Sequence, residues 1–276
     1  YGNPLNSSYN ASYDSYFQPV NGIWPYAQSN SATSTLRGMV TGTRVKVLGG
    51  SNYIYTVNIY DSKGRPIQVQ STNLTGGIDI TTTQYNWAGQ PLIIVQKLQK
   101  AGINQQTTIL VTQLTYDEAG RLVKTEKRIS NSLVNGGAMS AFKIVSQLEY
   151  DALGQLKKKI LGTGSNTNGA LETENFEYNI RGWLLGMNRD YARDINSTNY
   201  FGFDLGYDKA NNNLVGAQTY LNPQFNGNIE GMVWKAKGDG EKRKYDFTYD
   251  AANRLLSADF NQYTGGSFNK TAQVDF

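Results

Sequence analysis

A short motif recurs seven times along this chain of 276 residues, and no other feature restricts the fold as much. Every copy begins with a tyrosine that is followed by aspartate or asparagine. Five copies have glycine four residues after the tyrosine, and the last two have asparagine there. Self-similarity of this kind indicates a repeat protein. The copies comprise Tyr60, Asp61 and Gly64; Tyr85, Asn86 and Gly89; Tyr116, Asp117 and Gly120; Tyr150, Asp151 and Gly154; Tyr178, Asn179 and Gly182; Tyr207, Asp208 and Asn211; and Tyr249, Asp250 and Asn253.

Each copy is predicted to form the tip of a β-hairpin. Aspartate or asparagine at the first turn position can bond the backbone two residues on, and glycine is favoured at the last position of a type I turn. The flanking residues 57–60 and 147–150 alternate between apolar and polar, as strands do. We therefore predict an all-β fold of antiparallel hairpins. One window, residues 138–145, is compatible with a short helix.

The spacing of the motif distinguishes between β architectures. Successive motif tyrosines are 25, 31, 34, 28, 29 and 42 residues apart. A propeller blade repeats more evenly, at about 40–50 residues. The spacing favours hairpins stacked into a curved or spiral sheet, with regular turns on one side and variable loops on the other. Both ends of such a sheet expose unpaired backbone, so we expect more protein beside one or both.

Residues 1–36 differ from residues 37–276. They are rich in serine, asparagine and tyrosine, and aromatic residues such as Tyr13, Tyr16, Phe17 and Trp24 punctuate them. A free linker would carry fewer aromatic residues. We expect an extended N-terminal segment that lies on another surface through these rings, followed by the repeat region.

The composition excludes several chemistries. There is no cysteine and no histidine, so disulfides, thiolate metal sites and histidine-based catalytic triads are excluded. The net charge is only +4, and the densest basic cluster, residues 235–244, is interpreted as a solvated loop and not as a nucleic-acid site. No apolar run approaches the ~20 residues that span a bilayer. We expect neither a nucleic-acid partner nor a membrane span.

The carboxylates do not form a convincing site. Asn86 and Asn179 replace the motif aspartate, which a catalytic or metal-binding role would not tolerate. Asp239 and Glu241 lie in a glycine-containing stretch that lacks the calcium-loop pattern. Glu172 and Glu174 are the pair that a carboxylate-based glycosidase would need, yet a solvated rim explains them better. We expect no enzyme activity, no metal and no cofactor.

Aromatic residues leave a binding function open. The motif tyrosines are expected to pack against neighbouring hairpins. Trp87 and Trp183 lie within or just after a turn, so we expect these two to make outward contacts if any aromatic residue does. A surface adhesin or carbohydrate-binding module is therefore the alternative function.

The third copy carries a family resemblance. Its sequence from residue 116 to 123 is Tyr-Asp-Glu-Ala-Gly-Arg-Leu-Val, which resembles the YD repeats of the Rhs (rearrangement hotspot) family of large bacterial surface and secreted proteins. The resemblance covers residues 37–276, and residues 226–231 also look like part of such proteins. Gln90, Gln155 and Trp183 depart from the usual arginine, and Asn211 and Asn253 from the usual glycine.

The resemblance implies a function as well as a fold. In this family a long β-sheet winds into a hollow shell that encloses a C-terminal effector, often a toxin, and related shells occur in insecticidal toxin complexes and teneurins. The terminal core with which some members cleave themselves is not recognised here. The chain is expected to be an early-to-middle shell segment of a secreted or cell-surface bacterial protein. Its partners would be further repeats and the enclosed domain of its own polypeptide, with secretion machinery or a surface partner.

Overall fold

The structure is a computed structural model, and it describes residues 5, 8–162, 169–195, 198–208, 220 and 222–270. Sixteen strands follow one another across one sheet in the order of the chain. Every strand pair with an assigned register is antiparallel, which confirms the predicted all-β fold of antiparallel hairpins. The chain divides into two compact units, Tyr1–Ser146 and Gln147–Phe276.

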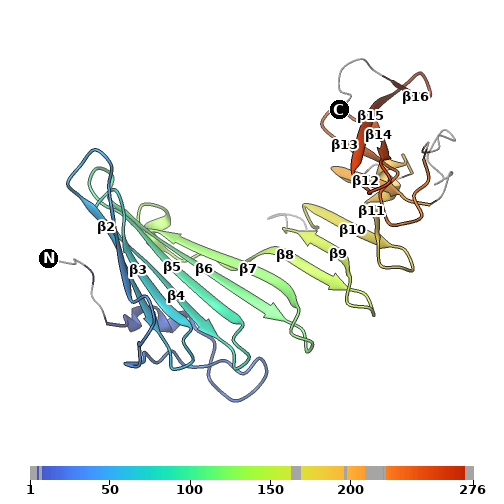
Figure 1. The fold of residues 1–276 in the computed structure, drawn as a ribbon. Coiled ribbons are helices and arrows are strands. Elements are labelled where there is room, and N and C mark those ends of the chain that lie inside the picture. Colours follow the sequence, from blue (N-terminus) through green and yellow to red (C-terminus); the bar gives the residue numbers. More distant parts are fainter. Residues whose placement is uncertain are drawn as a thin grey trace. The chain divides into compact units, whose positions relative to one another are not determined.

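The first unit contains seven complete strands and a 3₁₀ helix, η1 (Ala11–Tyr16). In Figure 1 its strands lie side by side in chain order, coloured blue to green. A second, single-turn 3₁₀ element, η2 (Asn135–Gly137), interrupts the connection that follows them. The strands are β1 (Gly42–Lys46), β2 (Tyr53–Tyr60), β3 (Pro66–Thr72), β4 (Ile78–Tyr85), β5 (Pro91–Lys100), β6 (Gln106–Tyr116) and β7 (Leu122–Asn131), and β8 (Lys143–Tyr150) starts in this unit.

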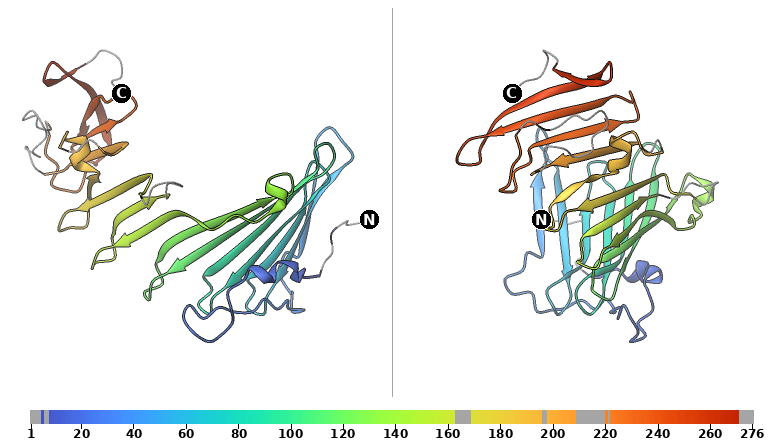
Figure 2. Two further views of the ribbon diagram at one scale, coloured as in Figure 1. Left: turned by 180° about the vertical axis from the view of Figure 1, so that it is seen from behind. Right: turned by 90° about the vertical axis from the view of Figure 1, so that its right-hand side faces the viewer.

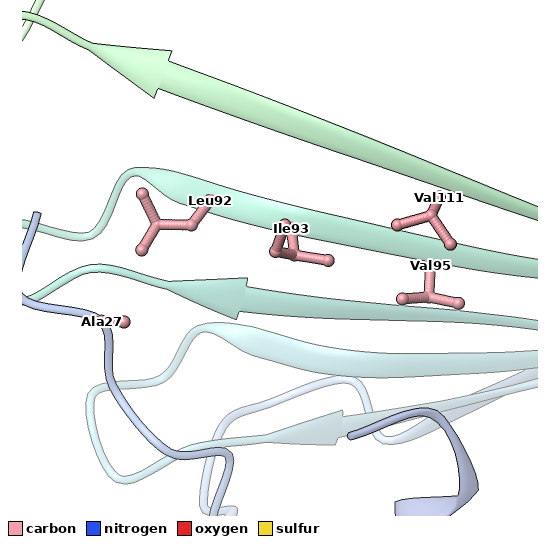
Figure 3. Packing of buried hydrophobic residues seen from close by; sticks show 5 residues of the cluster. All are labelled: Ala27, Leu92, Ile93, Val95 and Val111. Atoms are coloured by element: carbon pink, nitrogen blue, oxygen red, sulfur yellow. The ribbon is translucent and has the colours of Figure 1, made fainter. Parts of the chain in front are cut away.

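The core of the first unit lies on one face of its sheet. Alternate residues of β4, Ile80, Thr82 and Gln84, are buried, because side chains of a strand point to opposite faces in turn. Figure 3 shows an apolar cluster on this face. It consists of Ala27, Leu92, Ile93, Val95 and Val111.

Segment 8–36 covers this face. The rings of Tyr13, Tyr16 and Phe17 pack against the apolar cluster, as expected of a segment that lies on a surface through its aromatic side chains. Figure 2 shows η1, in dark blue, beside the strands of this unit. Ala27 forms an isolated antiparallel bridge with Asn86, so part of the segment pairs with the sheet through its backbone.

The second unit continues the hairpin pattern, and its described residues include one short α-helix, α1 (Arg189–Ala192). Glycines on β12 and β13 permit close packing on one face. A Cβ on Gly202 would lie 2.4 Å from the carbonyl oxygen of Asn188, next to α1. The strands are the end of β8, β9 (Leu156–Leu161), β10 (Glu172–Tyr178), β11 (Leu184–Met187), β12 (Phe201–Gly206), β13 (Gly231–Ala236), β14 (Lys242–Tyr249), β15 (Leu255–Thr264) and β16 (Ser267–Lys270).

Two sequence-based expectations are wrong in detail. Residues 138–145 form no helix: Ala138 is extended (φ −64°, ψ 137°) and β8 begins at Lys143. The β-branched pair Ile144 and Val145 suits a strand better than a helix. The sixth motif copy does not link neighbouring strands by a four-residue turn, because Gly206 pairs with Gly231 across residues 207–230. Its Asn211 lies outside the described residues.

Candidate functional site

The motif aspartate organises its turn through both carboxylate oxygens. Oδ1 of Asp61 accepts hydrogen bonds from the backbone N–H groups of Lys63 and Arg65, each at 2.9 Å. Oδ2 accepts from Nε of Arg65 at 2.7 Å. The backbone N–H of Gly64 donates to the carbonyl of Asp61 at 3.0 Å, which closes the turn. Both carboxylate oxygens therefore accept hydrogen bonds from groups of their own turn and stabilise the loop.

The same backbone arrangement recurs in six copies. In each, the N–H of the aspartate or asparagine donates to the carbonyl four residues on, at 2.8–3.0 Å. The residue at the last turn position has positive φ, which costs glycine little and asparagine less than most residues. These residues are Gly64 (76°), Gly89 (90°), Gly120 (78°), Gly154 (82°), Gly182 (79°) and Asn253 (61°).

The side chains one and five positions after the tyrosine contact each other in two forms. Where aspartate meets arginine the two form an ion pair, as in Asp117 and Arg121, whose Oδ2 and Nε are 2.7 Å apart. In the second copy the amide Nδ2 of Asn86 instead donates to Oε1 of Gln90 at 2.8 Å. A neutral pair thus replaces a charged one with the same geometry. This exchange shows how asparagine replaces aspartate in the turn of the second copy while the contact to the fifth position is kept.

Hydrogen bonding shifts the pKa of these carboxyls. Burial raises the pKa of Asp61, but hydrogen bonds from the backbone and side chain of Arg65 outweigh it and bring the pKa below its ordinary value. The pKa values of Asp117 and Asp250 are lowered first by the backbone N–H of the arginine four residues on and then by its side chain. These aspartates are therefore ionised near neutral pH and serve as hydrogen-bond acceptors.

A β-bulge follows the turn. Ile59 pairs with Gln68 but Tyr60 pairs with Pro66, so Ile67 is an extra residue on its strand. The bulge turns Ile67 and Gln68 toward the same buried face. The same register shift occurs at the second, third, fifth and seventh copies. Each such turn therefore directs an additional side chain to one face of the sheet.

The motif tyrosines connect successive hairpins. The phenol of Tyr85 donates to the carbonyl of Pro66, six residues after the preceding motif tyrosine, at 3.1 Å. The same donation recurs at Tyr116, Tyr178 and Tyr207, and the phenols of Tyr60 and Tyr249 donate to carbonyls at other positions. We call this set the tyrosine ladder. Burial raises the pKa of the Tyr85 phenol, which keeps the donor protonated. The other bonds are Tyr60 to Val40 at 2.9 Å, Tyr116 to Pro91 at 3.1 Å, Tyr178 to Leu156 at 3.1 Å, Tyr207 to Leu184 at 2.9 Å and Tyr249 to Ile229 at 2.9 Å.

The side chain five residues after the motif tyrosine also bonds to the next turn. Nη1 of Arg65 donates to the carbonyl of Asn86 at 3.1 Å. Nε2 of Gln90 donates to the carbonyl of Gly120 at 2.6 Å. Because arginine and glutamine can both donate, either residue links neighbouring turns. The first and second copies, and likewise the second and third, are thus linked by two side-chain contacts, one from the tyrosine and one from the fifth position, and neither was evident from the spacing of the motif alone.

The two tryptophans lie in different surroundings. The Trp87 side chain is 71% exposed, and Nζ of Lys63 lies 5.3 Å from its ring centroid. It lines a cavity of about 350 Å³ together with Val20 and Tyr26. Trp183 is partly buried, and its ring centroid lies 5.2 Å from that of Tyr207. Trp87 is therefore the more accessible of the pair.

The expectation that residues 235–244 form a solvated basic loop is wrong for part of this stretch. Lys242 and Lys244 lie on β14 and are only 5% and 4% exposed. Nζ of Lys244 is 2.8 Å from Oδ2 of Asp246, and Nζ of Lys242 is 2.6 Å from Oδ2 of Asp194. Alternate residues of a strand share a face, so the alternation of Lys242, Lys244 and Asp246 was an overlooked indication of a buried charged face.

This buried charged face extends to α1. Oδ1 of Asp204 is 3.3 Å from Nε of Arg189, and its Oδ2 is 2.5 Å from Nε of Arg193. Burial raises the pKa of the Asp204 carboxyl above its ordinary value, while Arg189 and Arg193 act in the opposite direction and favour its ionised form. The ring of Tyr220 lies over the paired glycines Gly206 and Gly231, where any Cβ would overlap it.

The remaining acidic candidates are engaged by cations or amides. Arg243 bonds both Asp239 and Glu241. Glu174 forms an ion pair with Lys159 at 3.2 Å, and Oε1 of Glu172 accepts from the side-chain amide of Asn199 at 2.8 Å. Among the described residues there is no group of three or more acidic side chains arranged to hold a metal ion. Within the same residues, no helix has the length and apolarity to cross a membrane.

The chain matches no known family model and no curated protein. Among solved structures it is similar to part of a mutant Tc holotoxin pore of Photorhabdus luminescens, with 14% identity, 82% of this chain covered and a TM-score of 0.30. The chain spans 11% of that toxin chain. A porin-like protein from Bacteroides uniformis is 12% identical, with 84% of this chain and 90% of that chain covered and a TM-score of 0.17. Both TM-scores are too low for either likeness to bear on function.

Proposed function

We propose that this chain is a structural repeat segment of a large Rhs-type protein, secreted or displayed on a bacterial cell surface. In this proposal it forms part of the wall of a β-shell that encloses or presents a C-terminal effector domain. The observation that carries the proposal is the tyrosine ladder. Through Tyr85, Tyr116, Tyr178 and Tyr207 it joins a hairpin to the preceding one by the same bond, so hairpins can be added along the sheet with a repeated contact.

The chemistry of the turns supports a structural role. The motif carboxylates accept hydrogen bonds inside their own turns, and Asn86 with Gln90 replaces the ion pair without loss of geometry. A catalytic carboxylate would need a free oxygen directed at a substrate. The partners in this proposal are the other repeats and the enclosed domain of the same polypeptide, with export machinery or a surface receptor.

The proposal is tested on the complete polypeptide that contains this chain. Under limited proteolysis of the native protein, the region after the repeats should be protected for much longer than the same region expressed alone. Tyr85→Phe combined with Tyr116→Phe should shorten that protection, and Tyr53→Phe, whose tyrosine lies outside the motif, should not. Equal cleavage rates for the enclosed and the isolated region would contradict enclosure.

The second candidate is carbohydrate binding at Trp87. An exposed indole beside the half-exposed ring of Tyr26 could stack on a sugar face. Binding to a glycan array should then be lost in Trp87→Ala. Ile180→Ala is the matched control, because Ile180 occupies the same turn position in another copy and is fully exposed. An unchanged array profile for Trp87→Ala would contradict this function.

A further inference from the structure

Glutamine side chains on the buried face bind the backbone of segment 8–36. Oε1 of Gln68 accepts from the backbone N–H of Asn10, and its Nε2 donates to the carbonyl of the same residue, both at 2.9 Å. Gln84 makes the same pair of bonds to the N–H and carbonyl of Gln18, also at 2.9 Å. Both glutamines are 1% exposed. Each amide thus bonds both the N–H and the carbonyl of one residue, as a residue of a neighbouring antiparallel strand does.

A third glutamine extends the set. Nε2 of Gln70 donates to the carbonyl of Ser8 at 3.1 Å and to Oε1 of Gln68 at 2.9 Å. Nε2 of Gln84 also donates a hydrogen bond to the carbonyl of Gln28, at 3.2 Å. Polar side chains are rarely buried without a partner, because an unsatisfied amide costs free energy. Their presence in a core face is explained by the peptide groups that they bind.

The segment then continues along the edge formed by the turns. Its residue Gln28 donates a backbone hydrogen bond to the carbonyl of Tyr85 at 2.9 Å, and Trp87 donates one to the carbonyl of Tyr26 at 3.0 Å. The N–H of Thr33 reaches the carbonyl of Tyr60 at 2.9 Å. An extended peptide that pairs in this way with a sheet gains affinity from its backbone.

The side chains of the segment define the chemistry of the ligand. Residues 8–36 contain one charged residue, Asp14, and its carboxylate accepts a hydrogen bond from the phenol of Tyr9 at 2.6 Å. Tyr13, Tyr16 and Phe17 supply the apolar contacts to the sheet. The ligand of this face is therefore an extended, nearly uncharged polypeptide with a few aromatic anchors.

We infer that this face of the first unit is a polypeptide-binding groove, and that segment 8–36 of a second copy of this chain can fill it as well as the chain's own segment. The groove is defined by Gln68, Gln70 and Gln84 with the apolar cluster. Exchange of an identical element between copies preserves every contact and needs only an opened connection. The connection is residues 37–41, and a single turn at its start places the N–H of Met39 3.0 Å from the carbonyl of Leu36.

The test uses the full chain with a specific protease site inserted between residues 37 and 39. The protein is folded first and cut afterwards, so no fragment has to fold alone. One cut preparation carries a donor dye on segment 8–36, and the other carries an acceptor dye on the sheet. The two preparations are mixed at micromolar concentration. Energy transfer between copies should appear as segments exchange, and size-exclusion chromatography should show the segment retained on the rest of the chain.

The variants separate backbone binding from general packing. Gln68→Met and Gln84→Met keep side-chain volume but remove the amide, and each should weaken retention by roughly tenfold or more. Gln96→Met is the matched control, because Gln96 lies on β5 with its side chain on the opposite face. Loss of the segment from the cut wild-type chain, absence of exchange between copies, or equal retention in all three variants would overturn the inference.

Discussion

The phenol of Tyr116 donates a hydrogen bond to the carbonyl of Pro91, 3.1 Å away on the preceding hairpin. Pro91 is the sixth residue after the preceding motif tyrosine, Tyr85, whose own phenol bonds to Pro66 in the same way. The motif thus encodes a contact between repeats as well as a turn within each repeat. Proline can occupy the acceptor position because this bond uses only the carbonyl group and not the backbone N–H that proline lacks.

Removing one bond of the tyrosine ladder should destabilise the first unit measurably. Tyr116→Phe deletes the donor and leaves the partly buried carbonyl of Pro91 without it, so we expect a loss of about 1 kcal/mol in the free energy of unfolding. Urea denaturation monitored by tryptophan fluorescence measures it. Tyr53→Phe is the control, because Tyr53 is an exposed tyrosine of the same unit outside the motif. Equal effects of the two changes would refute the ladder as a source of stability.

The paired exchange of charged and neutral turns gives a second prediction. Asp61→Asn should leave Arg65 without its ion pair, and Arg65→Gln should leave Asp61 without its cation. The double variant recreates the pair seen in Asn86 and Gln90, so its destabilisation should be smaller than the sum of the two single effects. A coupling of about 0.5–3 kcal/mol is typical of groups in direct contact. A double-mutant cycle in urea measures it, and strict additivity would show that the two positions act separately.

The lowered pKa of Asp61 predicts how this turn responds to acid. A carboxyl whose pKa is lower in the folded state stabilises the fold above its unfolded pKa, about 3.9, and that contribution is lost as the pH falls through the folded pKa. The difference in unfolding midpoint between the wild type and Asp61→Asn should therefore be constant above about pH 5 and shrink below pH 4. Denaturation series between pH 7 and pH 2.5 test this. A difference that grows on acidification would have the wrong sign.

Backbone conformation at the last turn position gives a separate prediction. Gly120 has φ +78°, and its Cβ position lies 3.2 Å from Nε2 of Gln90. Gly120→Val should cost about 1–3 kcal/mol, because a β-branched residue is strained at positive φ. Gly120→Asn should cost less, since Asn253 holds the equivalent position at φ 61°. Gly50→Val is the control, as Gly50 lacks positive φ and has room for a side chain. Equal thermal stability of the two valine variants would contradict this account of the turn.

The turns were predictable because their chemistry is local. Asp61 and Gly64 are three residues apart, and the preferences of a type I turn depend on little else. The bond from Tyr116 to Pro91 was not predictable, because it depends on which hairpin lies alongside and in what register. Gln68 and Gln84 give another example. In the sequence they are polar residues in strands, and their role follows only from the segment that packs across them.

Register also explains why the buried charged face of the second unit was missed. Lys244 pairs with Val233 on one side and Asn261 on the other, so its surroundings come from three strands. In the sequence Lys244 lies in a run of cationic residues beside Arg243, and such a run predicts side chains that are exposed to solvent. The alternation of Lys242, Lys244 and Asp246 contains the correct information, but it identifies a buried face only once the neighbouring strands are known.

The pair formed by Lys244 and Asp246 leads to the last prediction. Both side chains are nearly inaccessible to water, and Nζ lies 2.8 Å from Oδ2. Lys244→Met should cost about 3–5 kcal/mol, because it leaves the Asp246 carboxylate buried without its cation. Lys244→Met combined with Asp246→Leu should recover much of that loss, since it removes the isolated charge as well. Lys237→Met, at an exposed lysine just after β13, should change stability by less than about 1 kcal/mol. Chemical denaturation of the four proteins distinguishes the outcomes: a small loss in Lys244→Met would mean that water reaches Asp246 in solution, and the pair would then be a surface contact.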